Sequence, residues 1–405
     1  MNFSAWALQL NALLEQHQAL WRHNAYQSLD LKPFNDYPEL LPYLLTLSDS
    51  ELFKLQADDR SLLRALLPFF PPAAELLTLI TLASPENPSY CEPPSGIPGR
   101  KWQQIQAFIN AHPTENTISK HHFSSTPVIE WCSGKGYLSE AMVRRYQLKS
   151  VGLEIDQALV ASGNVRAAST NISRRIVNCD VFSDLVFQYV DNSQQILALH
   201  ACGGLHQRLL RTAVNGGSPR LSLSPCCYHR FNDGEYQNQS TLMRSCSLIL
   251  NNEDLRTAVR QTLTARVGET VARRQLQARY FALRVILNEQ GLAADISLPS
   301  TAQHLSKATF TDWMQAILAL KPLAIHIPSN SDHYEALGWQ YLHKAERVEL
   351  VRMAFRRAIE LHCVLDSVLF LQEHHYHCTL SEFCSTALTP RNLLIQADKL
   401  TPPQT

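Results

Sequence analysis

The stretch VIEWCSGKGYLS, from Val128 to Ser139, decides which fold we expect for this chain. A short apolar strand ends in the acid Glu130, and a Gly-x-Gly turn, Gly134 to Gly136, then opens a helix. Glycines let the backbone approach a ligand closely, and the free N–H groups of the first helical turn point toward it. The pattern therefore predicts a strand–turn–helix unit with a ligand at its turn.

The segments after this unit alternate between strands and amphipathic helices. Strands are predicted at 149–156, 174–180, 194–201 and 220–225, with helices at 157–169 and 205–214. Alternation at this spacing is typical of parallel βαβ units whose helices cover both faces of a sheet. We therefore expect an α/β fold with a Rossmann-like sheet.

The rest of the chain is predicted to be mainly helical. Residues 1–82 carry apolar side chains at three- and four-residue spacing, with Ser48 or Asp49 as a helix N-cap. The proline-rich segment 84–99 predicts a linker. We expect a helical N-terminal domain at 1–95 and a sheet domain at 96–405. A helical insertion at about 233–375 would separate the fifth strand from a closing hairpin at 376–399.

Two further acids stand where the next two strands end. Glu154 lies 18 residues after Gly136, close to the ~20 at which a carboxylate meets ribose hydroxyls in nucleotide-binding units. Asp156 is the alternative, but we prefer Glu154 because it stands at the strand end. Asp180 ends the third strand. The G-x-G-x-x-G spacing of dinucleotide sites fails, because Ser139 replaces the third glycine.

An acid after each of the first three strands resembles the class I S-adenosylmethionine methyltransferases. The resemblance implies S-adenosylmethionine as cofactor. Glu130 and the Gly134–Gly136 turn would hold the methionine part, Glu154 the ribose hydroxyls and Asp180 the adenine amino group. The predicted cofactor-binding residues are Glu130, Cys132, Gly134, Gly136, Glu154, Asp180 and His200.

A second signature follows the fourth and fifth strands. It consists of His200-Ala201-Cys202-Gly203 and, about 25 residues later, Cys226-Cys227-Tyr228-His229-Arg230. The pair resembles the methyltransferase superfamily that includes the tRNA acceptor-stem 2′-O-methyltransferases and related methyltransferase-like proteins. Tyr228 stands where the tRNA enzymes carry a second histidine. The resemblance covers about 98–232 and resumes in the tail. It implies methylation of RNA, with tRNA favoured, at a ribose 2′-hydroxyl or a base nitrogen.

A ribose hydroxyl needs a base or a positive group beside it, for which His229 and Arg230 are the candidates. The predicted catalytic residues are His229, Arg230, Cys227 and His200.

Three interpretations of Cys202, Cys226 and Cys227 stay open: apolar packing, zinc binding together with His200 and His229, or part of a substrate pocket. We favour the pocket and predict no metal. A rival enzyme class would use Cys226 or Cys227 as a nucleophile on pyrimidine C5, but its Pro-Cys normally follows the fourth strand rather than the fifth.

The charge balance limits how RNA could bind. There are 36 basic and 36 acidic side chains, so a binding surface must be a local patch. The predicted patch lies in the helical insertion and comprises Arg256, Arg260, Arg266, Arg273, Arg274, Arg279 and Arg284.

The alternatives in function are a protein or small-molecule methyltransferase and a cofactor-binding pseudo-enzyme or interaction protein. We expect a cytoplasmic protein, because the ten cysteines come without a secretory signal or a membrane-spanning stretch.

Overall fold

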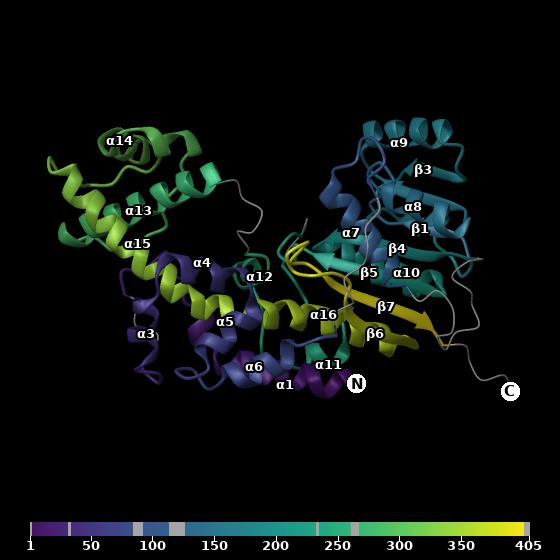
Figure 1. The fold of residues 1–405 in the computed structure, drawn as a ribbon, viewed down its shortest axis with the longest axis horizontal. Coiled ribbons are helices and arrows are strands. Elements are labelled where there is room, and N and C mark those ends of the chain that lie inside the picture. Colours follow the sequence, from purple (N-terminus) through teal and green to yellow (C-terminus); the bar gives the residue numbers. More distant parts are fainter. Residues whose placement is uncertain are drawn as a thin grey trace. The chain divides into compact units, whose positions relative to one another are not determined.

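A computed structural model describes residues 2–30, 34–83, 92–112, 126–231, 235–260 and 267–400. The chain forms two compact units, each built from separate segments (Figure 1). The sheet unit comprises Met1–Glu15, Leu79–Val259 and Arg357–Thr405, and the helical unit comprises Gln16–Thr78 and Arg260–Arg356.

This division differs from the predicted domains 1–95 and 96–405. The reason is that a helix of the predicted insertion, α15 (Ser331–Ala354), packs against helices α2 to α5 of the N-terminal region. The first half of the predicted linker, residues 84–91, lies outside the described residues.

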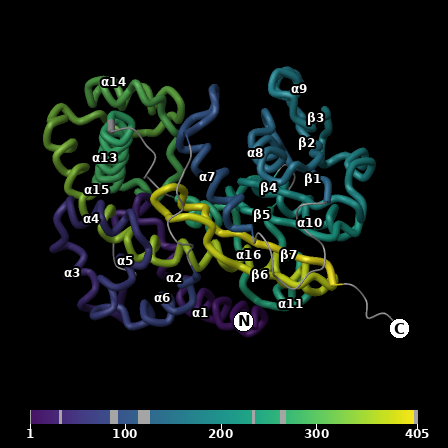
Figure 2. The backbone as a smooth tube through the Cα atoms, turned by 45° about the vertical axis from the view of Figure 1, so that its right-hand side comes forward, coloured from purple at the N-terminus to yellow at the C-terminus, as the bar shows by residue number. Residues whose placement is uncertain are grey.

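The sheet has seven strands in the order β3-β2-β1-β4-β5-β7-β6. Neighbours from β3 to β5 are parallel, whereas β7 is antiparallel to both β5 and β6. This confirms the predicted α/β Rossmann-like sheet and its closing hairpin, which Figure 2 shows in yellow. The strands are β1 (Val128–Glu130), β2 (Ser150–Glu154), β3 (Arg174–Asn178), β4 (Gln195–Cys202), β5 (Arg220–Cys226), β6 (Tyr376–Glu382) and β7 (Leu393–Lys399).

Helices complete the sheet unit. Phe108 of α7 and Met142 of α8 are fully buried in one apolar cluster with Leu197 of β4, so these two helices cover one face of the sheet. Helix α10 packs against β4 and β5. The elements are α1 (Phe3–Gln16), α7 (Gly99–Asn110), α8 (Tyr137–Tyr146), α9 (Gln157–Ser169), η1 (Asp184–Gln188), α10 (Gly204–Gly216), α11 (Thr241–Arg244), α12 (Asn252–Ala258) and α16 (Arg356–Glu373).

The helical unit is organised around α13 and α15. They approach closely at Gly338, where a side chain would lie 2.2 Å from the Ala278 carbonyl oxygen. The predicted cap is present, because Ser48 and Glu51 form a capping box at the start of α4. None of the described helices is long and apolar enough to cross a membrane. The elements are α2 (Gln18–Trp21), α3 (Leu40–Thr46), α4 (Asp49–Ala57), α5 (Asp59–Leu66), α6 (Ala73–Ile80), α13 (Val267–Glu289), η2 (Gln303–Lys307), α14 (Phe310–Leu320) and α15 (Ser331–Ala354).

Candidate active site

The strand order reverses between β1 and β4, and in open parallel sheets ligands bind at such a point, beyond the carboxyl ends of the strands. A cavity of about 1060 Å³ lies at this edge. Its wall contains Cys132, Glu154 and Asp180, which follow or end β1, β2 and β3. The cavity is at the upper end of the usual range for ligand sites, roughly 300–1000 Å³. Three of the predicted cofactor residues therefore meet in one cavity large enough for a cofactor.

Glu154 connects the second strand to the glycine turn. One carboxylate oxygen accepts a hydrogen bond from the Gly134 N–H at 2.8 Å, and the other accepts from the Asp156 N–H at 3.0 Å. Each carboxylate oxygen has a second lone pair that can accept a further bond. Asp156 has a different role, because it caps α9 by accepting from the Ala158 and Leu159 N–H groups.

The other two acids differ in burial. Asp180 is exposed to the cavity and accepts a bond from the Phe182 N–H at 2.9 Å. Glu130 is buried and accepts from the Ser139 N–H at 3.0 Å, in the first turn of α8. Burial raises the pKa of Glu130, although its bonds to Ser139 oppose this. Glu130 is not part of the cavity wall, and its bond to Ser139 stabilises the start of α8.

The two glycines of the turn differ in how much space surrounds them. Both have left-handed φ values, 56° at Gly134 and 72° at Gly136. A side chain at Gly134 would meet open space, whereas one at Gly136 would lie 1.8 Å from a guanidinium nitrogen of Arg174. Arg174 donates to the Lys135 carbonyl at 2.7 Å and to the Gly163 carbonyl at 2.8 Å. Gly136 is therefore required by the protein's own arginine, and only Gly134 leaves room for a ligand.

The two halves of the second signature are bonded to each other. The Gly203 N–H donates to the Cys226 carbonyl at 3.1 Å, and the Gly204 N–H donates to the Arg230 carbonyl at 2.8 Å. A side chain at Gly203 would lie 1.6 Å from that Arg230 oxygen. The glycine of the signature, Gly203, therefore allows the loop after β5 to pack closely against the end of β4.

The predicted catalytic residues gather beside the cavity, not in its wall. His200 occupies a register irregularity of β4, with φ of 63°, and its Nε2 lies 3.0 Å from Gln104 Oε1. Burial, then the charge of Arg391, lowers its pKa to about 4. His229 is half-buried, its Nδ1 has no hydrogen-bond partner in the described part of the chain, and burial lowers its pKa. Arg230 is exposed.

Tyr228, by contrast, points into the core. It is fully buried and donates to a Glu360 carboxylate oxygen at 3.2 Å. The tyrosine of the signature is therefore a structural residue.

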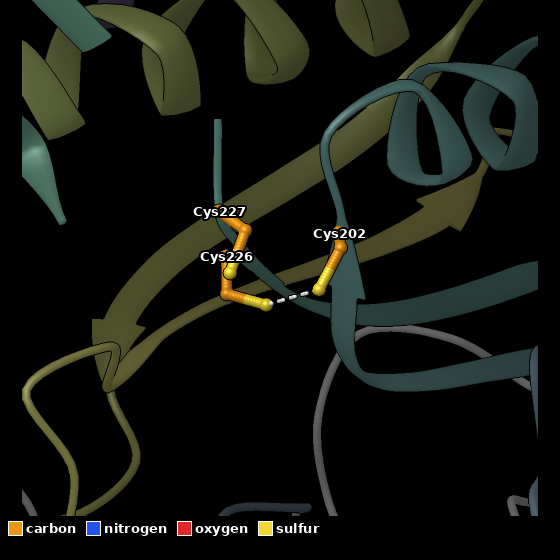
Figure 3. Close-up of side chains that lie close together, drawn as sticks. All are labelled: Cys202, Cys226 and Cys227. Carbon is orange, nitrogen blue, oxygen red and sulfur yellow. Dashed lines mark hydrogen bonds between the residues drawn. The ribbon is translucent and has the colours of Figure 1, made fainter. Parts of the chain in front are cut away.

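Cys202, Cys226 and Cys227 form one cluster (Figure 3), with all three sulfurs within 4.8 Å of one another. The Cys202 and Cys226 sulfurs are 3.1 Å apart. Hydrogen bonds from these two thiols, helped by the charges of Arg391 and Arg230, lower the pKa of Cys227, while the same coupling raises the pKa of Cys226. None of the three lines the cavity, which disfavours both the pocket interpretation and a nucleophilic role.

The far side of the cavity carries residues that no sequence motif indicated. Asn238 and Gln239 both line it, and each has one buried amide atom, Asn238 Oδ1 and Gln239 Nε2, that finds no hydrogen-bond partner among the described residues. Their orientations are fixed, because Asn238 Nδ2 donates to the Met243 carbonyl and Arg211 donates to Gln239 Oε1. The cavity wall therefore includes two amide side chains whose hydrogen-bonding capacity is not fully used by the described residues. Other lining residues on this side are Phe231, Phe370, Gln207, Arg211 and Arg244.

Most arginines of the predicted RNA-binding patch form ion pairs or hydrogen bonds within the protein. Arg260 pairs with Glu349, Arg274 with Glu346 and Asp49, and Arg279 with Glu335, while Arg284 donates to backbone carbonyls. Arg256 and Arg273 are exposed, and Arg266 lies outside the described residues. Four of the seven arginines therefore have a structural explanation.

Comparison with known families shows that residues 100–234, one third of the chain, match a family described as "Methyltransferase domain". No curated protein matches the chain. The matched segment spans β1 to β5, and the sheet unit has the α/β Rossmann-like methyltransferase fold, for which the methyl donor is S-adenosylmethionine.

Several solved structures are similar to the chain. A geranyl diphosphate C-methyltransferase from Streptomyces coelicolor is 16% identical, with 31% of this chain and 46% of that chain covered and a TM-score of 0.25. The chain thus spans about half its length. A Podospora anserina methyltransferase is 10% identical (75% and 89% covered, TM-score 0.29), and coclaurine N-methyltransferase is 9% identical (96% and 100% covered, TM-score 0.28). TM-scores this low say nothing about the substrate.

Proposed function

We propose that the chain transfers a methyl group from S-adenosylmethionine to a nucleotide of RNA. The observation that carries the methyltransferase part is the convergence of Glu154 and Asp180 on one cavity at the reversal of strand order. A carboxylate at the end of β2 suits the ribose hydroxyls, and an exposed carboxylate at the end of β3 suits the adenine amino group. The sulfonium is already activated, so the protein needs mainly to align donor and acceptor.

The acceptor proposal rests on the far side of the cavity. Asn238 and Gln239 line the cavity, and neither Asn238 Oδ1 nor Gln239 Nε2 has a hydrogen-bond partner among the described residues. An amide side chain can pair with a donor and an acceptor on the edge of a nucleobase. Phe231 and Phe370 supply aromatic faces, on which unpaired RNA bases stack. The exposed Arg211 and Arg244 also line the cavity and can fork to phosphate. RNA therefore fits this side better than an apolar small molecule.

The test is mass spectrometry of nucleosides from tRNA and rRNA of a strain that lacks this chain. We expect one methylated nucleoside to disappear and to return when the wild-type chain is restored. The double variant Asn238→Ala with Gln239→Ala should not restore it, because two groups that read the base are gone. Gln315→Ala, which removes an exposed amide on α14 of the helical unit, should restore it. An unchanged set of nucleosides would overturn the RNA proposal.

A further inference from the structure

We propose that Cys202, Cys226 and Cys227 bind one Zn²⁺ ion at the carboxyl ends of β4 and β5. The three sulfurs already lie within 4.8 Å of one another. Sulfurs bound to zinc at about 2.3 Å in tetrahedral geometry lie about 3.8 Å apart. Shifts of a side-chain torsion are therefore enough to bring all three sulfurs to one ion.

The backbone is shaped to bring these sulfurs together. Successive residues of a strand point to opposite faces of the sheet, so Cys226 and Cys227 would ordinarily diverge. Cys227 instead has a left-handed φ of 48°, which is uncommon for a residue with a side chain. Figure 3 shows the result, with the Cys227 sulfur on the same side as those of Cys226 and Cys202. Apolar packing gives no reason for this strain, whereas a shared ligand does.

The third thiol comes from the neighbouring strand. Cys202 and Cys226 are register partners of the parallel pair β4 and β5, and the Gly203 N–H donates to the Cys226 carbonyl at 3.1 Å. The carboxyl ends of β4 and β5 are therefore held together by the protein before any ion binds. Such preorganisation favours metal binding, because little chain entropy remains to be lost.

The surrounding charge also suits a thiolate site. Three thiolates and one Zn²⁺ carry a net charge of −1. Arg230 belongs to the same turn as Cys227, because its N–H donates to the Cys227 carbonyl at 2.9 Å. The segment that would carry this negative charge therefore also carries a positive one. Three protein ligands leave the fourth position of a tetrahedral ion open, as in catalytic rather than structural zinc sites.

A disulfide is the rival interpretation of the cluster. It would join Cys202 to Cys226, whose sulfurs are 3.1 Å apart. Neighbouring strands are about 4.8 Å apart, at the short end of the range in which disulfides form without strain. A disulfide also uses only two sulfurs and leaves the unusual turn at Cys227 unexplained. The three-thiol arrangement therefore favours the metal.

The first experiment uses the untagged full chain as purified. Elemental analysis should find zinc near one equivalent per chain. After removal with a chelator, added Zn²⁺ should slow alkylation of Cys202, Cys226 and Cys227 by about tenfold or more, since bound thiolates react poorly. Cys246, a half-buried cysteine outside the cluster, should be alkylated at an unchanged rate. Mg²⁺ should protect none of them, because it prefers oxygen ligands.

The second experiment uses Cys227→Ser, which keeps the size of the side chain and removes one ligand. We expect its zinc content to be a small fraction of that of the wild-type chain, whereas Cys246→Ser should bind as much zinc as the wild type. Binding of Co²⁺ to the wild-type chain should produce thiolate-to-cobalt charge-transfer absorption, which Cys227→Ser weakens. If Cys227→Ser does not fold, the effect of zinc on alkylation of the wild-type chain still tests whether the three thiols bind the ion. Unchanged alkylation with zinc, or a Cys202–Cys226 disulfide in fresh protein, would overturn the proposal. Neither readout depends on methyl transfer.

Discussion

At the scale of single residues, Gly203 and Gly134 offer a matched comparison. Both have left-handed φ values, 49° and 56°, but a side chain at Gly203 would lie 1.6 Å from the Arg230 carbonyl oxygen, while one at Gly134 would meet nothing within 4 Å. Gly134→Ala should lower the free energy of unfolding by about 1–2 kcal/mol through backbone strain alone. Gly203→Ala should cost about 3 kcal/mol or more, because the loop after β5 must move. Urea unfolding measures both, and equal losses would contradict the docking of the two signature loops.

Individual site residues differ in how far the sequence could predict them. Glu154 and Asp180 were predictable because each acid ends an apolar strand, and strand ends of a parallel sheet meet at one edge. Glu130 occupies an equivalent position in the sequence but lies outside the cavity wall, where it accepts from the Ser139 N–H. Asn238 and Gln239 follow no strand and belong to no motif. Only the tertiary packing of their segment brings them to the cavity.

At the scale of elements, local periodicity predicted strands and helices well, whereas packing between distant segments was not predictable. The predicted helix at 157–169 is α9 (Gln157–Ser169), and the predicted strand at 220–225 is β5 (Arg220–Cys226). The boundary between units depends on which helices share a core. Helix α15 packs in one core with α2 to α5. No sequence pattern within either segment indicates which distant helices it will contact.

Two adjacent arginines of helix α13 differ in their surroundings. Arg274 pairs with the buried Glu346, whereas its neighbour Arg273 is exposed. Arg274→Glu should lower the stability of the helical unit by about 3–5 kcal/mol, because it leaves a buried carboxylate beside a like charge. Arg273→Glu should change stability by no more than about 0.5 kcal/mol. Thermal unfolding followed by circular dichroism checks both. An Arg274→Glu protein as stable as the wild type would contradict the ion pair. Because Arg273→Glu should leave stability unchanged, it is the better variant for measuring RNA binding.

At the scale of the whole molecule, four histidines make the sheet unit less stable in acid. Burial lowers the pKa of His112, His200, His206 and His362 to about 4 each, from 6.5. Between these values the unfolded chain binds more protons than the folded one. Stability should therefore be constant above about pH 7 and fall as the pH drops from 6.5 to 4, by up to about 1.4 kcal/mol per pH unit for each histidine.

Denaturant unfolding at several pH values measures this slope. Neither ring nitrogen of His362 has a hydrogen-bond partner among the described residues, so His362→Leu should remove one histidine's share of the slope and keep the fold. A slope that is the same in wild type and His362→Leu would show that other groups control the acid response.

The central claim is that S-adenosylmethionine binds at the strand ends, and titration calorimetry tests it most directly. The wild-type chain should bind one equivalent. Glu154→Gln and Asp180→Asn should each weaken binding about tenfold or more, because a hydrogen bond to a charged group contributes about 1.5–3 kcal/mol. Asp156→Asn is the matched control, since asparagine also caps a helix well, and it should leave the affinity unchanged. No binding by the wild-type chain, or full affinity in both Glu154→Gln and Asp180→Asn, would contradict the account.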